Sequence, residues 1–171
     1  MSSNSFKIQV HDLIRKPGGM REHNFDVVLG EDFGNAIAAV RVGETLELDT
    51  RLESVHEGIL VTGVAFATAQ TECSRCLDEL KLAVEVDFQE LFAYSGTQEE
   101  DFLVQDDQVD LEQVVRDAVV LSLPFQPVCR PNCLGLCPEC GVKMAKDPNH
   151  VHDQPIDSRW AELQKLQSKE E

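Results

Sequence analysis

Apolar and polar residues alternate along the middle of the chain. The segments from Leu46 to Glu53 and from Leu80 to Phe88 both alternate with a period of two, which predicts half-buried β-strands. Between them, a turn at His56-Glu-Gly58 precedes a long strand from Ile59 to Thr71. Three consecutive strands with short connections predict an antiparallel meander.

Two more strands and a helix extend this pattern. The strands are predicted from Phe6 to Val10 and from Asn24 to Leu29, joined through the turn at Pro17-Gly18-Gly19. After an acidic loop, Asp110 opens a helix over about residues 110–123, with Gln113 placed for a capping box and Pro124 after its end. The residues expected to share the apolar face of this helix are Leu111, Val114, Val115, Ala118 and Leu121.

A second helix is predicted from about Asp157, where Trp160, Leu163 and Leu166 are spaced to cover a groove or the sheet. Together the elements predict an α+β fold, with an antiparallel sheet that could close into a barrel-like form and one packed helix. A Cys-rich segment then follows. The predicted division is residues 1–128 for the β domain and residues 129–171 for the Cys/His segment and C-terminal helix.

Cysteines and histidines gather late in the chain in a layout typical of metal sites. In the knuckle Cys137-Pro-Glu-Cys140-Gly141, the proline fixes one backbone angle and the glycine permits the turn that directs amides at the sulfurs. Sulfur and imidazole sets of this kind bind zinc, and closed sets of four are structural. The candidate ligands are Cys73, Cys76, Cys129, Cys133, Cys137, Cys140, His150 and His152.

Spacing alone leaves the partition of these ligands open. In one arrangement, Cys73 and Cys76 join Cys129 and Cys133, while Cys137 and Cys140 join His150 and His152. In the other, the two Cys-x-x-Cys pairs form a single site, and Cys129 and Cys133 are free thiols. We therefore expect one or two zinc ions. A zinc-ribbon or thiol redox enzyme that uses a Cys-x-x-Cys pair is the alternative function, although Cys73 ends one strand pattern and Cys76 precedes another, unlike the strand-to-helix setting of thioredoxin-type motifs.

The net charge of −16 is concentrated in the middle of the chain. Residues 22–128 carry 5 basic and 23 acidic side chains, whereas residues 1–21 are net positive. A strongly negative body repels phosphates and attracts basic proteins, or serves only to keep the protein soluble. Direct RNA contact is thus expected only from the basic segments near the two ends. The candidate RNA-binding residues are Arg15, Lys16, Arg21, Arg130, Lys143 and Lys146.

Several classes of protein are disfavoured by the sequence. The N-terminal residues lack the apolar core of a signal peptide, and no apolar run approaches membrane-spanning length, so we expect a cytoplasmic protein with reduced thiols and no membrane partner. Phosphate-binding loops, nucleophile elbows and His-Glu-x-x-His helices are absent from the sequence, which argues against an enzyme.

Five segments in order give the chain a family resemblance. They are Asp12-Leu-Ile-Arg-Lys-Pro-Gly-Gly, Cys73-Ser-Arg-Cys-Leu, Val115-Arg-Asp-Ala-Val-Val-Leu-Ser-Leu-Pro, Cys129-Arg-Pro-Asn-Cys-Leu-Gly-Leu-Cys-Pro-Glu-Cys-Gly and Ile156-Asp-Ser-Arg-Trp. In this order they resemble the bacterial YceD family over nearly the whole chain, with an actinobacterial character. Where some members carry a later Cys-x-Cys, this chain has His150-Val-His152, an exchange of thiolate for imidazole that preserves a zinc site.

This resemblance implies a function. Members are described as large ribosomal RNA subunit accumulation proteins, plant organelle relatives are linked to large-subunit rRNA processing, and the gene often neighbours that of a small basic ribosomal protein. By resemblance, the chain is a non-enzymatic factor in ribosome biogenesis. Its implied partners are large-subunit rRNA or a pre-ribosomal particle, and a small basic ribosomal protein.

Overall fold

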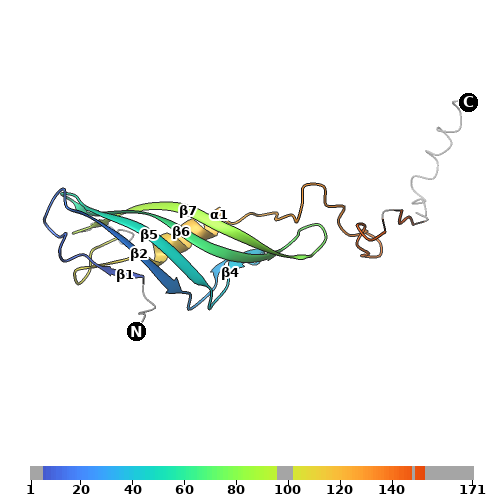
Figure 1. Ribbon diagram of the computed structural model, residues 1–171, viewed down its shortest axis with the longest axis horizontal. Coiled ribbons are helices and arrows are strands. Elements are labelled where there is room, and N and C mark those ends of the chain that lie inside the picture. Colours follow the sequence, from blue (N-terminus) through green and yellow to red (C-terminus); the bar gives the residue numbers. More distant parts are fainter. Residues whose placement is uncertain (1–5, 96–101, 148, 153–171) are drawn as a thin grey trace, which may run out of the picture.

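The computed structural model describes residues 6–95, 102–147 and 149–152 (Figure 1). The strands are β1 (Lys7–Gln9), β2 (Met20–Val28), β3 (Phe33–Gly34), β4 (Ala38–Val40), β5 (Thr45–Ser54), β6 (Gly58–Glu72), β7 (Glu79–Ala93) and β8 (Gln108–Asp110), and the helix is α1 (Glu112–Ser122). The central strand β6 pairs with β5 and β4 on one side and with β7 along the whole of the other, always antiparallel. β2 and β3 extend this six-stranded sheet.

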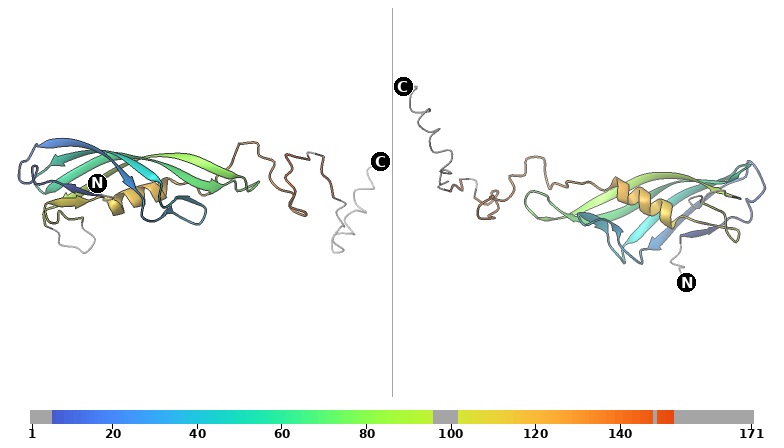
Figure 2. Two further views of the ribbon diagram at one scale, coloured as in Figure 1. Left: turned by 60° about the horizontal axis from the view of Figure 1, so that its bottom comes forward. Right: turned by 180° about the vertical axis from the view of Figure 1, so that it is seen from behind.

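The sheet curls into a half-barrel, and α1 lies across its concave face (Figure 2). The core fills the space between them, because the inward-facing residues of β5 and β6, such as Leu48 and Val61, are buried together with Val115 and Val119 of α1. Each such side chain contributes about 1.5–3 kcal/mol when it leaves water. The predicted α+β fold, with an antiparallel sheet and one packed helix, is confirmed.

The N-terminal strands pair differently from the prediction of successive strands joined at Pro17-Gly18-Gly19. β1 pairs with β8, whereas β2 pairs with β5 and begins at Met20 instead of Asn24. Glu22 and His23 are both exposed, so hydropathy carries no signal there although the backbone pairing continues. β8 leads directly into α1, so the pairing of β1 with β8 places the N-terminal segment beside the start of that helix.

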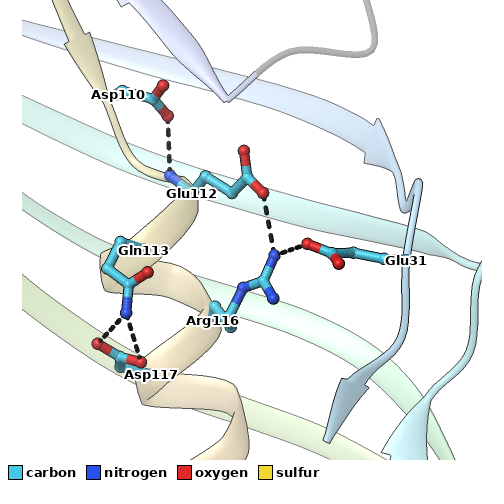
Figure 3. Close-up of polar contacts among 6 residues, drawn as sticks. All are labelled: Glu31, Asp110, Glu112, Gln113, Arg116 and Asp117. Atoms are coloured by element: carbon cyan, nitrogen blue, oxygen red, sulfur yellow. Dashed lines mark hydrogen bonds and ion pairs between the residues drawn. The ribbon is translucent and has the colours of Figure 1, made fainter.

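Two details of the helix prediction were wrong. The N-terminal cap is Leu111, without a side-chain cap, and Gln113 donates forward to the Asp117 carboxylate at 2.9 and 3.0 Å, so no capping box forms. Asp110 instead accepts a hydrogen bond from the Glu112 amide at 3.1 Å (Figure 3). Leu121 is 82% exposed, and the buried residues of the helix include Val115 and Val119 instead.

An arginine fixes α1 to the loop between β2 and β3. The Arg116 guanidinium pairs with Glu31 and, at 3.0 Å, with Glu112 on its own helix (Figure 3). It also lies over the ring of Phe33, 4.6 Å from the centroid. The Glu31 carboxylate, the largest influence, raises the pKa of Arg116. The interaction sets the orientation of the helix, whose C-terminal end leads to the Cys-rich segment.

Part of the sequence prediction lies outside the described residues. The helix expected from Asp157 falls in residues 153–171, and the division of the chain at residue 129 stays a prediction. Of the helices in the described ranges, none is long and apolar enough to cross a membrane.

Candidate metal centres

The tip of the β6–β7 hairpin presents the first two cysteines. The Cys73 amide donates to the Asp78 carbonyl at 2.8 Å, and the Leu77 amide donates to the Cys73 carbonyl at 2.9 Å. Leu77 adopts a left-handed conformation with φ of 57°, which lets the chain reverse within this short turn. Both sulfur atoms of Cys73 and Cys76 are consequently buried at the end of the sheet.

The segment after α1 brings two more cysteines to the same place. The Ser74 amide donates to the Pro127 carbonyl at 2.8 Å. The Arg75 guanidinium donates to the carbonyls of Pro131 and Cys133, both at 3.2 Å. These bonds attach the segment to the hairpin tip, so that residues separated by more than 50 positions in sequence meet around one centre.

The four sulfur atoms of Cys73, Cys76, Cys129 and Cys133 form the first cluster. All lie within 4.8 Å of one another. The Cys73–Cys133 separation is 3.9 Å and the Cys76–Cys129 separation is 3.7 Å. For zinc–sulfur bonds of about 2.3 Å, the edges of a tetrahedron are about 3.8 Å. The cluster therefore has the dimensions of a tetrahedral thiolate site that could hold a metal ion.

Backbone amides favour the thiolate form of one cysteine in this cluster. The Cys129 amide points at the Cys73 sulfur at 3.4 Å and, with the amides of Cys76 and Arg75, lowers the pKa of Cys73 to about 6. The Asp78 amide acts to lower the pKa of Cys76, but burial, the Asp78 carboxylate and the Cys73 sulfur prevail and raise it to about 12. Thiolates this close together repel one another, and a bound cation would offset that repulsion.

The second cluster joins Cys137 and Cys140 to His150 and His152, again within 4.8 Å. Its knuckle is closed by a hydrogen bond of 2.8 Å from the Cys137 amide to the Val142 carbonyl, and Gly141 adopts φ of 72°. The amides of Cys140 and Glu139 lower the pKa of Cys137 to about 6. This set of two thiols and two imidazoles could hold a metal ion as well.

Carboxylates orient both imidazoles of the second cluster. The Nε2 atom of His150 lies 3.0 Å from the Cys140 sulfur and 2.8 Å from Nε2 of His152. Each Nδ1 atom faces an acid instead: Asp147 at 3.6 Å from His150, and Glu139 at 3.4 Å from His152. A carboxylate on the far nitrogen is the usual arrangement around metal-ligating histidines, since it fixes the ring and its tautomer.

The second cluster is attached to the first through the hairpin tip. The Leu136 amide donates to the Arg75 carbonyl at 3.0 Å, and Lys143 forms an ion pair with Asp78. Gly135 has φ of 77°, and a Cβ there would stand 3.1 Å from the Arg75 carbonyl oxygen. These contacts depend on the position of Arg75, which lies between Cys73 and Cys76.

The six basic candidates do not form one surface. Gly18, two residues after Lys16, donates its amide to the carbonyl of Ser54, the last residue of β5, which lies near the start of β6. The Cys-rich segment lies at the opposite end of β6. The 15 residues of β6 between these ends span about 50 Å. Arg21 is paired with Asp12 at 2.8 Å, and Lys143 is paired with Asp78.

Some contributors were missed in the sequence, namely Arg75, Asp78, Glu139 and Asp147. They contact or orient the candidate ligands without belonging to either cluster. A signal for three of them was present, because Arg75, Asp78 and Glu139 lie within, or two residues beyond, a Cys-x-x-Cys pair. Asp147 precedes His150 by three residues. Such second-layer groups are not readable from ligand spacing alone.

The protein is thus a curled antiparallel sheet that carries two candidate metal clusters at one end. The family model described as large ribosomal RNA subunit accumulation protein YceD matches residues 61–167. The chain belongs to the YceD family. The matched region contains all eight candidate metal ligands.

Relatives with closely similar sequences come from mycobacteria. An uncharacterised protein of Mycobacterium tuberculosis is 47% identical over 163 residues, which cover 91% of this chain and 78% of the relative. One of Mycobacterium leprae is 40% identical over 156 residues, or 87% and 71% of the two chains. The maize chloroplast protein named large ribosomal RNA subunit accumulation protein YCED homolog 1 is 37% identical over 43 residues, 25% of this chain and 15% of its own. No solved structure matches.

Proposed function

We propose that the protein is a cytoplasmic, non-enzymatic factor that supports accumulation and assembly of the large ribosomal subunit. The observation that carries this proposal is the family match over residues 61–167, which includes most of β6, the whole of β7 and α1, and both clusters. The name of the maize relative supports it. A thiol redox enzyme is less well supported, because Cys73 and Cys76 lie buried among other sulfurs instead of at an accessible surface.

Two structural zinc ions complete this proposal, one in each cluster. Both clusters offer four ligands of the sulfur and imidazole type that zinc prefers, and a set of four leaves no position for a reacting water molecule. The first ion would hold the segment after α1 on the hairpin tip. The second would order the chain between Cys137 and His152. The metals would thus shape a surface and perform no chemistry.

Contact with rRNA would come from the basic residues at the two ends of the sheet. Because Arg21 and Lys143 are engaged by carboxylates, the phosphate contacts are assigned mainly to Arg15, Lys16, Arg130 and Lys146. The acidic sheet between the two ends would repel RNA and attract a basic ribosomal protein. Both interactions can operate in one particle, since they use different surfaces.

Depletion of the protein in its own cells tests the proposal. We expect the ratio of large-subunit to small-subunit rRNA to fall and the wild-type gene to restore it.

Charge variants test the assigned RNA contacts. Changing Arg15, Lys16, Arg130 and Lys146 to glutamate should weaken crosslinking to rRNA, whereas a control with the same charge change at Arg41, Arg51, Lys81 and Lys7 should do so less. An unchanged rRNA ratio after depletion would contradict the proposed function.

A further inference from the structure

β7 is an edge strand along most of its length. β6 pairs with it continuously from Gly58 opposite Ala93 to Glu72 opposite Glu79. On the other side, the described residues contribute a single bridge, from Ala93 to Leu103. Between Glu79 and Phe92, this outer side of β7 therefore meets no strand from the described part of the chain.

The backbone of alternate β7 residues points out of this edge. The Ala93 amide donates outward to the Phe102 carbonyl at 2.8 Å, and the Ala93 carbonyl accepts from the Val104 amide at 2.9 Å. The Leu91 amide donates to the Glu90 side chain at 3.0 Å. Because hydrogen-bonding direction alternates along an antiparallel strand, the amides and carbonyls of Lys81, Ala83, Glu85, Asp87 and Gln89 face outward in the same way.

The edge is regular in its backbone, while α1 packs against β7 on the concave side. β7 contains no proline, and its register against β6 runs through 15 consecutive pairs without a bulge. Edge strands in natural proteins are commonly interrupted by prolines, bulges or lysines, and Lys81 is the only basic residue in β7. A long regular edge of this kind can accept an added strand from another protein.

The acidic side chains of β7 determine which kind of added strand this edge would favour. Glu79, Glu85 and Asp87 are exposed on the convex side of β7. The register places carboxylates of β5 in line with two of them across β6: Glu47 with Glu85 through Phe66, and Asp49 with Asp87 through Val64. An added strand would lie beside these acidic rows, where lysine and arginine gain and phosphates are repelled.

The same carboxylates disfavour a second copy of this chain. A symmetric antiparallel pairing of two β7 edges centred on Val86 would place Glu85 opposite Asp87 of the other copy, twice. Like charges directly opposite each other destabilise a sheet. The acidic residues thus act against self-association while leaving the backbone groups available to a basic segment.

The concave side of the β7 edge favours apolar residues in an added strand. Leu80, Leu82 and Val86 of β7 are only half-buried, and the latter two pack against the core beneath the edge. Side chains of an added strand alternate between faces, so one set would cover these residues while the other met the carboxylates. We propose that the outer edge of β7 binds an extended segment of a basic protein, with lysine or arginine alternating with apolar residues, as an added strand.

This inference rests on the proposed function in one respect, that a basic ribosomal protein is the natural source of such a segment. Binding of the segment itself can be measured without ribosomes. A failure of peptide binding would leave the effect of depletion on rRNA intact, and an absent rRNA effect would leave peptide binding intact. The two proposals can therefore fail separately.

Amide hydrogen exchange on the full chain tests the site. The probe is a short synthetic peptide that alternates lysine with valine and threonine. At saturation, we expect exchange at Lys81, Ala83, Glu85, Asp87 and Gln89 to slow by on the order of tenfold or more, while the amides that already pair with β6 change little. A peptide of equal charge whose backbone amides are N-methylated cannot donate the strand hydrogen bonds, and should protect these amides far less.

Charge variants separate the edge from general attraction. Glu85→Lys together with Asp87→Lys should reduce peptide affinity by about tenfold or more, since the cationic peptide would meet two new positive charges. The matched control is Glu22→Lys with Asp26→Lys on β2, which makes the same change in net charge at the opposite edge and should have a smaller effect. Protection of the inward amides of β7 verifies that each variant is folded.

Three results would overturn the proposal. Equal protection by the N-methylated peptide would mean that the attraction is electrostatic without strand addition. Protection of the same amides by the protein's own increasing concentration would assign the edge to a second copy. Protection by an RNA oligonucleotide but not by the lysine peptide would assign it to nucleic acid.

Discussion

The two Cys/His clusters differ in what they connect. The first draws Cys73 from a hairpin tip together with Cys133 from beyond the helix, and three of its four cysteines are buried. The second is formed within residues 137–152, and Cys140 is exposed. The first cluster therefore determines how distant parts of the chain meet, whereas the second orders only its own segment. Loss of one should not resemble loss of the other.

The largest effect is expected from Cys133→Ser. Serine is a poor zinc ligand, so the first ion should be lost. The attachment of Leu136 to Arg75 depends on the same hairpin tip, so the second ion should also bind more weakly. We expect zinc content to fall from two ions per chain to one or fewer and protease cleavage to accelerate between Ser122 and Cys129. An unchanged zinc content would contradict the first site.

Cys137→Ser sharpens the comparison from the other side. The second ion should be lost while the first stays bound, giving one zinc ion per chain by elemental analysis. Because no strand or helix of the sheet domain contributes to this cluster, we expect the thermal unfolding midpoint of the sheet to shift by less than about 2 °C. A larger shift would show that the second cluster supports the sheet and that the contrast between the two is wrong.

A smaller effect is expected from Arg75→Ala. The side chain donates to the carbonyls of Pro131 and Cys133, so its loss should loosen the loop that carries two ligands of the first cluster. Groups of this kind typically change metal affinity by about tenfold or more. Competition with a chromophoric chelator measures the change, and Arg51→Ala, on β5 away from both clusters, is the control. Equal affinities for the two variants would mean that Arg75 has no supporting role.

The sequence predicted the long elements and favoured the division of the eight candidate ligands into the two clusters that the structure shows. Alternation located β5, β6 and β7, because each has one face in the core. The short strands β3, β4 and β8 have two or three residues and no period to detect. Spacing was also compatible with a single site made by the two Cys-x-x-Cys pairs. The choice depends on bonds such as that from Ser74 to Pro127, which follow from the path of the chain after α1.

The 56-position gap between Cys73 and Cys129 also has a consequence for the order of events during synthesis. At about 5–20 residues per second, the hairpin cysteines leave the ribosome roughly 3–11 seconds before their partners. In that interval they form half a site, which can bind zinc only weakly. The site could close only once the strands, the helix and the segment up to Cys133 have all been made, so a tightly bound ion in the first cluster would mark a chain whose sheet and helix have come together.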